Sequence, residues 1–192
     1  MRKFEFTVVA SLCLLAPIAV AQENKTDGAA KAAEASMSMP MPRPGAEHGF
    51  LRTSEGTWDV TVEGQSMPKM TGVAEMKMSL NGFWLVEEFK GEAMGMQYEG
   101  HGTHGYDQAS GEYVSTWIDN MSSYLMVTKG SLDPETKVLT MKGDGYDQMG
   151  KPVKVRSTLH HVDAETVRYD MFHTGDDGAE QKVMTVTYKK KK

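Results

Sequence analysis

From Gly56 to the end of the chain, short runs rich in Val, Thr, Tyr, Trp and Met alternate with turn-forming residues. This spacing, with a turn about every 8 to 12 residues, is typical of an all-β sandwich or barrel. No stretch of useful length shows the helical period. We predict ten strands, at positions 56–64, 69–80, 83–91, 95–105, 112–119, 123–130, 136–143, 152–161, 165–173 and 179–188.

The connections between these runs are short and carry turn residues, among them Asn81-Gly82 and the segment 175–178, Gly-Asp-Asp-Gly. Strands joined in this way pair with their neighbours in the chain as hairpins. An open meander would leave two unpaired edges, and closure of the sheet removes both. We therefore expect a single antiparallel up-and-down β-barrel of the lipocalin or calycin kind. A single helical turn is predicted ahead of it, at 47–51.

The N-terminus has the three parts of a signal peptide. Basic residues at positions 2 and 3 precede an apolar stretch, and Ala19-Val20-Ala21 forms a cleavage site. The apolar stretch of about 15 residues is shorter than the roughly 20 that a membrane helix needs, so no stable membrane span is expected. We predict cleavage after Ala21, with removal of residues 1–21 and of the chain's one cysteine, Cys13, and a periplasmic or secreted location.

Residues 22–44 contain no aromatic residue and no Val, Ile or Leu. Such a segment buries too little to offset the entropy of ordering it. We interpret it as a disordered tether and place the barrel domain at 45–192. The formal net charge of −5 disfavours nucleic acid as a partner, because phosphate backbones bind to basic surfaces.

Several motifs resemble known families. Gly56-Thr57-Trp58 is similar to the lipocalin and fatty-acid-binding signature, which implies that Trp58 closes one end of the barrel beneath a basic residue, either Lys189 or Lys190. A longer resemblance, from about Pro44 to Tyr188, is to the bacterial family DUF1579, grouped with calycin-like barrels. It is carried by Pro44-Gly45-x-Glu47-His48, Gly56-Thr57-Trp58, Leu80-Asn81-Gly82-Phe83-Trp84-Leu85, Tyr98-Glu99-Gly100, Gly105-Tyr106-Asp107 and Trp117-x-Asp119. The resemblance implies the fold but no activity.

Strand alternation selects side chains that would face the interior. The residues expected to line a cavity are Met76, Met78, Glu87, Met96, Tyr98, His104, Trp117 and Asp119. A wall rich in Met adapts to irregular apolar guests, although the same methionines could simply fill core volume. Trp117-x-Asp119 has two interpretations: a polar anchor beside an aromatic wall, or a structural hydrogen bond at a strand end.

The pattern favours a binding protein over an enzyme, with a small apolar or amphipathic molecule as ligand. No cofactor is expected. One alternative is copper binding, because thioethers suit Cu(I) and Met37, Met39 and Met41 alternate in the tether. Another is a hydrolase or isomerase that uses cavity carboxylates, for which no Ser or Cys nucleophile motif is present. His101-x-x-His104 predicts no zinc site, since strand positions three apart face opposite sides.

Overall fold

The computed structural model describes residues 42–147, 149–175 and 178–192. The predicted signal peptide and nearly all of the predicted tether, including Met37, Met39 and Met41, lie outside these ranges. Within them, one short α-helix precedes ten strands. Their bounds are α1 Glu47–Arg52, β1 Gly56–Gly64, β2 Met70–Ser79, β3 Trp84–Ala93, β4 Met96–Asp107, β5 Glu112–Asp119, β6 Met126–Leu132, β7 Val138–Tyr146, β8 Pro152–Asp163, β9 Thr166–Thr174 and β10 Glu180–Lys190, with a 3-10 turn η1 at Leu80–Gly82.

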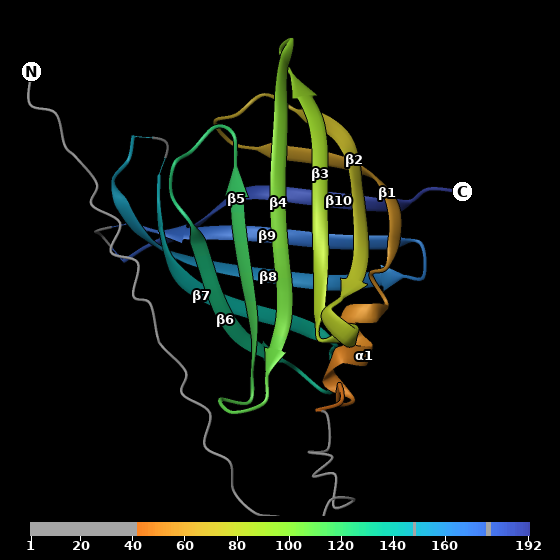
Figure 1. Cartoon of the computed structure of the whole chain (residues 1–192). Helices are drawn as coiled ribbons and strands as arrows, with labels where there is room; N and C mark the ends of the chain where they lie inside the picture. Colours follow the sequence, from red (N-terminus) through yellow and green to blue (C-terminus); the bar gives the residue numbers. More distant parts are fainter. Residues whose placement is uncertain (1–41, 148, 176–177) are drawn as a thin grey trace, which may run out of the picture. The chain divides into compact units, whose positions relative to one another are not determined.

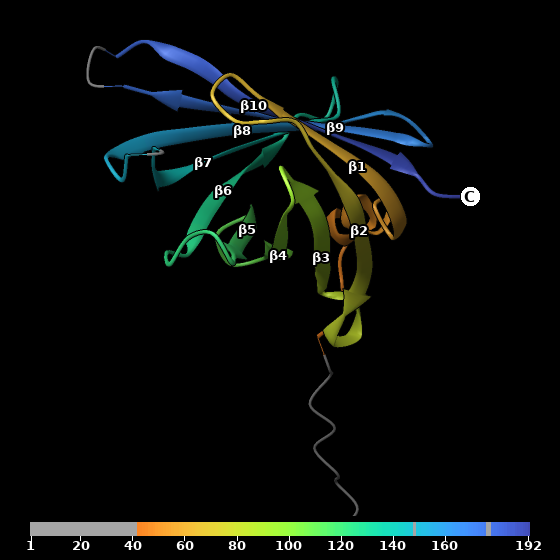
Figure 2. The ribbon, with the colours of Figure 1, turned by 90° about the horizontal axis from the view of Figure 1, so that it is seen from above.

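The strands form a closed antiparallel barrel in which each strand pairs with its neighbours in the chain (Figures 1 and 2). Closure comes from β1 and β10, which pair from Trp58 opposite Lys190 to Gly64 opposite Met184. The prediction of one up-and-down barrel of about ten strands is therefore confirmed. In the described part of the chain, no helix has the length and apolar character needed to cross a membrane.

Alternation along the strands builds the interior. On β1, Trp58, Val60 and Val62 are buried, whereas Asp59 and Glu63 between them are exposed. The prediction for the second strand was wrong at its end. It extended to position 80, but β2 ends at Ser79, and Leu80 turns outward with 70% of its surface exposed. Leu80 and Asn81 both adopt positive φ in η1, which ends the pleat.

Helix α1 closes one end of the barrel. Its Leu51 is buried in an apolar cluster with Leu85, Tyr113 and Leu139, and Phe50 packs against the same cluster. A backbone carbonyl in α1, that of Glu47, accepts a hydrogen bond from the Tyr113 hydroxyl at 3.1 Å. The predicted helical turn is thus confirmed, and it packs against β2, β3 and β4.

Trp58 lies near this closed end and is only 1% exposed. Its indole Nε1 donates a hydrogen bond to the carbonyl of Ser54 at 2.8 Å, so burial leaves no unsatisfied donor on this side chain. Lys190 Nζ lies 5.3 Å from the centre of the ring. Of the two predicted lysines, Lys190 covers the indole. In the strand register Lys190 lies opposite Trp58, whereas Lys189 lies opposite the outward-facing Asp59. Gly56 has φ +132°, and a Cβ there would lie 3.2 Å from Lys190 Cε.

Candidate functional site

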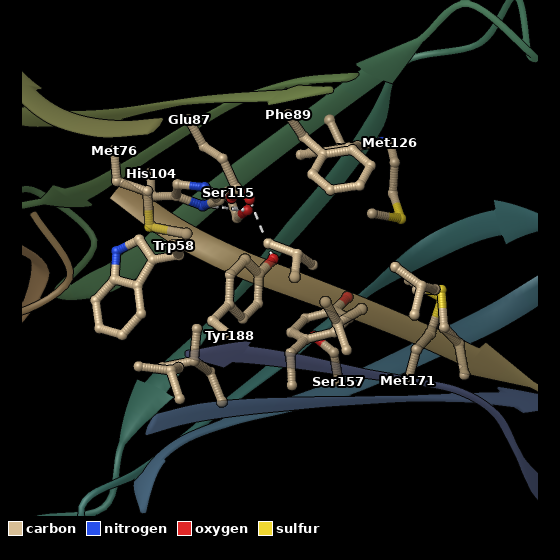
Figure 3. Close-up of a pocket in the computed structure, with 18 of the residues that line it drawn as sticks. Trp58, Met76, Glu87, Phe89, His104, Ser115, Met126, Ser157, Met171 and Tyr188 are labelled. Atoms are coloured by element: carbon tan, nitrogen blue, oxygen red, sulfur yellow. Dashed lines mark hydrogen bonds and ion pairs between the residues drawn. The ribbon is translucent and has the colours of Figure 1, made fainter. Parts of the chain in front are cut away.

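The barrel encloses a cavity of about 600 Å³ (Figure 3). Drug-sized ligands occupy pockets of roughly this size, about 300–1,000 Å³. Its wall is mainly apolar, and the described residues bring ten thioethers to it, from Met67, Met70, Met76, Met94, Met96, Met121, Met126, Met141, Met171 and Met184. Phe50, Leu51 and Trp58 line its closed end. Met94 and Met121 line it too but are 73% and 61% exposed, so the mouth lies beside the β3–β4 turn and the segment after β5.

Six of the eight residues expected from the sequence lie in this wall: Met76, Glu87, Met96, Tyr98, His104 and Trp117. Met78 lies outside it and packs against the apolar cluster below α1. Its backbone N–H donates to Glu55 Oε1 at 2.9 Å, which ties the end of β2 to the segment between α1 and β1. Asp119 also lies outside the wall, at the end of β5.

Asp119 organises the strand end and an aromatic side of the cavity at once. Its Oδ1 accepts hydrogen bonds from the backbone N–H groups of Met121 and Ser122, at 2.9 and 2.8 Å. Its Oδ2 accepts from the Tyr98 hydroxyl at 3.1 Å and from Trp117 Nε1 at 3.3 Å. Burial raises the pKa of Tyr98, so that hydroxyl stays protonated and donates. Asp119 therefore fixes the Tyr98 and Trp117 side chains from outside the cavity wall. Its role agrees with the interpretation of Trp117-x-Asp119 as a structural hydrogen bond at a strand end.

A second polar cluster lies inside the cavity, formed by Glu87, His104, Ser115 and Tyr188 (Figure 3). The Tyr188 hydroxyl donates to Glu87 Oε1 at 3.1 Å. Burial, and then the negative charge of Glu87, raise the pKa of Tyr188 well above its ordinary value. His104 links Glu87 to Ser115. Its Nε2 is 3.2 Å from Glu87 Oε2, and its Nδ1 is 2.8 Å from Ser115 Oγ.

The directions of these hydrogen bonds follow from the chemistry of the groups. An ionised carboxylate can only accept, so His104 Nε2 donates to Glu87. In the neutral imidazole Nδ1 then accepts, and the Ser115 hydroxyl donates to it. A single chain of hydrogen bonds thus runs from Ser115 through His104 to Glu87. Glu87 is only 4% exposed, and this pairing compensates its burial.

Strand register assembles this cluster. His104 on β4 lies directly opposite Ser115 on β5, and Glu87 on β3 lies opposite Gly102 on β4. The imidazole can lean toward Glu87 because position 102 has no side chain. A Cβ on Gly102 would stand 3.0 Å from His104 Nε2 and 3.1 Å from a ring carbon of Trp117. The absence of a side chain at Gly102 therefore leaves room for the His104 and Trp117 side chains to lie across β4.

The remaining polar groups of the wall are mainly neutral hydroxyls. Tyr169 is hydrogen-bonded to Ser157, and burial raises the pKa of Tyr169 to about 12. Ser157 and Thr128 also carry hydroxyls, and both residues are buried, with 1% and 4% of their surface exposed. Among the described residues the wall contains no lysine and no arginine. The described wall thus presents one carboxylate, one imidazole, the amide of Gln97 and several hydroxyls, but no permanent positive charge.

Among the histidines of the described ranges, His104 alone lines the cavity. His101 faces outward, with Nδ1 2.7 Å from Glu88 Oε1, as expected for strand positions three apart. His161 Nε2 lies 3.3 Å from Ser54 Oγ, and burial lowers the pKa of this histidine. Across 42–147, 149–175 and 178–192, no three His, Cys, Asp or Glu side chains lie close enough together to hold a metal ion.

Ser115 and Tyr188 were not among the residues predicted from the sequence to line the cavity. The signal was present in part, since Ser115 precedes Trp117 by two positions and shares its strand face. Tyr188 lies opposite Val60, an inward-facing residue of β1. Neither motif nor composition distinguishes these hydroxyls from others on the strands. Only the register of neighbouring strands brings them to Glu87 and His104.

The fold is similar to several designed barrels at low sequence identity. A de novo designed fluorescence-activating β-barrel is 15% identical with a TM-score of 0.42, covering 73% of this chain and 96% of that chain. The redesigned barrel mFAP1, solved with bound DFHBI, is 13% identical with a TM-score of 0.43, covering 73% and 98%. Likeness at this level supports no inference about a ligand. No curated protein matches the chain.

The model of the family described as "Protein of unknown function (DUF1579)" matches residues 43–190. The match covers helix α1 and all ten strands, and so includes every residue of the cavity wall described above. The chain belongs to the DUF1579 family.

Proposed function

We propose that this barrel binds a small apolar or amphipathic molecule whose polar group is neutral or positively charged. The observation that carries the proposal is the cavity of about 600 Å³, apolar over most of its wall, with Glu87, His104, Ser115 and Tyr188 clustered inside. Apolar burial supplies affinity in pockets of this kind, and a few polar groups fix the orientation of the ligand.

The charge of the ligand follows from the charges in the wall. The described wall contains the carboxylate of Glu87 and no lysine or arginine. A ligand carboxylate placed near Glu87 would meet a like charge in a region of low dielectric constant, where repulsion is strong. A hydroxyl or an ammonium group could instead donate to the remaining lone pairs of Glu87. The ten thioethers of the described wall adapt to irregular apolar chains, so the apolar part of the ligand is less restricted than its head.

Displacement of a neutral apolar dye, Nile red, tests both parts of this proposal. Dodecanol, dodecylamine and dodecanoic acid share a chain and differ in the head. We expect the alcohol and the amine to displace the dye at concentrations roughly tenfold lower than the acid, a difference of about 1.4 kcal/mol. Absence of saturable dye binding would overturn the binding function, and tightest binding of the acid would overturn the charge preference.

Two variants locate the effect. In Glu87→Gln the inward carboxylate becomes a neutral amide, and the preference against dodecanoic acid should shrink. Glu88→Gln is the matched control, because Glu88 is the next residue on β3 and points outward to His101. The Glu88 variant should keep the preference of the unmodified protein. Equal behaviour of the two variants would show that the discrimination does not arise inside the cavity.

A further inference from the structure

Ser115, His104 and Glu87 form a linear relay of nucleophile, base and carboxylate within one cavity. Ser115 Oγ is 2.8 Å from His104 Nδ1, and His104 Nε2 is 3.2 Å from Glu87 Oε2. A serine hydroxyl becomes nucleophilic when an adjacent base takes its proton and a third group orients that base. This arrangement is recognised by geometry and roles rather than by sequence order. We propose that Ser115 is the nucleophile of an esterase site for neutral apolar esters.

The inference rests on the proposed function, because the ester must first enter the cavity. All three residues line the cavity wall, so an ester bound in the cavity lies beside the relay. A neutral ester also meets the charge preference argued above. The surroundings of the relay are mainly apolar, with Leu85 and Phe89 buried on the same face of β3 as Glu87.

The proposed hydrolysis uses water as its second reactant. His104 Nδ1 takes the proton of Ser115 as Oγ bonds to the ester carbonyl carbon. The resulting imidazolium is stabilised by the carboxylate of Glu87, to which Nε2 donates. When the bond from carbon to the leaving alkoxide breaks, His104 returns the proton to that oxygen and the alcohol leaves. Water, deprotonated by the same nitrogen, then attacks the acyl-serine and releases the acid, restoring the Ser115 hydroxyl.

The oxyanion formed during attack needs a hydrogen-bond donor. Residues 113–117 of β5 are paired with both β4 and β6, so we assign the donor to a side chain of a neighbouring strand. Thr128 lies directly opposite Ser115 in the β5–β6 register, is buried, and lines the same cavity. Its hydroxyl is the nearest candidate in register. Thr128→Val keeps the shape of the side chain and removes this donor.

A fluorophosphonate probe tests the nucleophile directly. The serine oxygen bonds to phosphorus, fluoride leaves, and the proton passes to His104, which leaves a stable adduct visible by intact-protein mass spectrometry. We expect one adduct on the unmodified protein, mapped to Ser115 by peptide sequencing, and none on Ser115→Ala. Ser131→Ala is the matched control, since Ser131 lies on the neighbouring strand β6 but is exposed and lies outside the cavity wall. That variant should be labelled as the unmodified protein is.

Hydrolysis of p-nitrophenyl octanoate tests the relay. Ser115→Ala should reduce the rate to that of buffer, and His104→Ala should lower it by about 100-fold or more, the usual contribution of a general base. Glu87 is a positioning residue, so Glu87→Gln should lower kcat and leave KM unchanged. Glu87→Asp, which keeps the carboxylate, should recover part of kcat. A general structural loss would change dye binding and KM together.

Displacement of Nile red by the same ester separates this inference from the binding function. If the ester displaces the dye but is not hydrolysed above buffer, and the probe leaves no adduct at Ser115, the relay only orients ligands and the esterase inference is wrong. If neither dye nor ester binds, the binding function fails and the esterase inference fails with it. Labelling that persists in Ser115→Ala would also overturn the assignment.

Discussion

Among single residues, Trp58 combines deep burial with two specific contacts. It is 1% exposed, its Nε1 donates to the Ser54 carbonyl, and Lys190 Nζ lies 5.3 Å from the ring centre. Lys190 is exposed, which limits the worth of this contact to about 0.5–1 kcal/mol. The indole itself contributes far more, because replacing a buried Trp by Ala costs about 3–5 kcal/mol in lost burial and cavity formation.

We expect energetic coupling between Trp58 and Lys190 in a double-mutant cycle. Trp58→Leu removes the aromatic ring and Lys190→Met removes the charge while keeping the stem. The interaction free energy from denaturant unfolding should be about 0.5–1 kcal/mol. Lys189→Met is the control and should show no coupling, because Lys189 pairs with Asp59 on the outer register. Coupling of Lys189 rather than Lys190 would contradict the placement described for the end of β10.

At the scale of elements, β4 is shaped by the glycines that face the interior. Gly100 and Gly102 provide the space under the Trp117 ring, and Gly102 also lies against His104 Nε2. Side chains at these two positions would crowd the Trp117 ring, and one at Gly102 would also press on the His104 imidazole that joins Glu87 to Ser115. The candidate site thus depends on residues that contribute no chemical group of their own.

Gly102→Ala tests whether the space at position 102 sets the position of His104. The added Cβ would stand 3.0 Å from His104 Nε2, and overpacking of this kind costs about 1–3 kcal/mol. We expect a lower unfolding midpoint and, in a crystal structure of the variant, an imidazole displaced from Glu87. Gly49→Ala in α1 is the matched control, because a Cβ there meets nothing within 4 Å. An unchanged His104–Glu87 distance in Gly102→Ala would contradict this account of β4.

At the scale of the whole molecule, ten sequential hairpin partners close through β1 and β10. This closure leaves no free edge in the described sheet, and it brings the first and last strands of the domain side by side (Figure 2). The exported location remains a prediction, because it depends on residues 1–21.

We expect the mature protein to begin at Gln22. Expression of the complete chain in a bacterium with a general secretory system, followed by N-terminal sequencing of the periplasmic fraction, measures this. Replacing Ala19 and Ala21 by large residues should block cleavage, because the processing site requires small side chains. An uncut chain that accumulates in the cytoplasm before any such replacement would exclude the signal peptide.

Patterns along the chain were enough to predict the properties that depend on neighbouring positions. Turn residues at short intervals and alternation such as Trp58, Val60 and Val62 were enough for ten hairpin-connected strands and for most of the predicted wall residues. They failed where the backbone left the pleat, as at Leu80 with its positive φ. They also could not exclude Met78 from the cavity, because alternation says which face a residue takes but not which part of the interior it meets.

Which inward-facing groups meet depends on the folded barrel as a whole. Ser115, His104 and Glu87 come from three strands, and Tyr188 from the last one, 101 positions from Glu87. Their hydrogen bonds depend on the register of each strand pair and on the empty space at Gly102. Register is a property of pairs of strands, and a shift of one residue in any one of these strands would turn its side chains to the other face. For that reason the barrel could be predicted from the sequence, and the polar relay inside it could not.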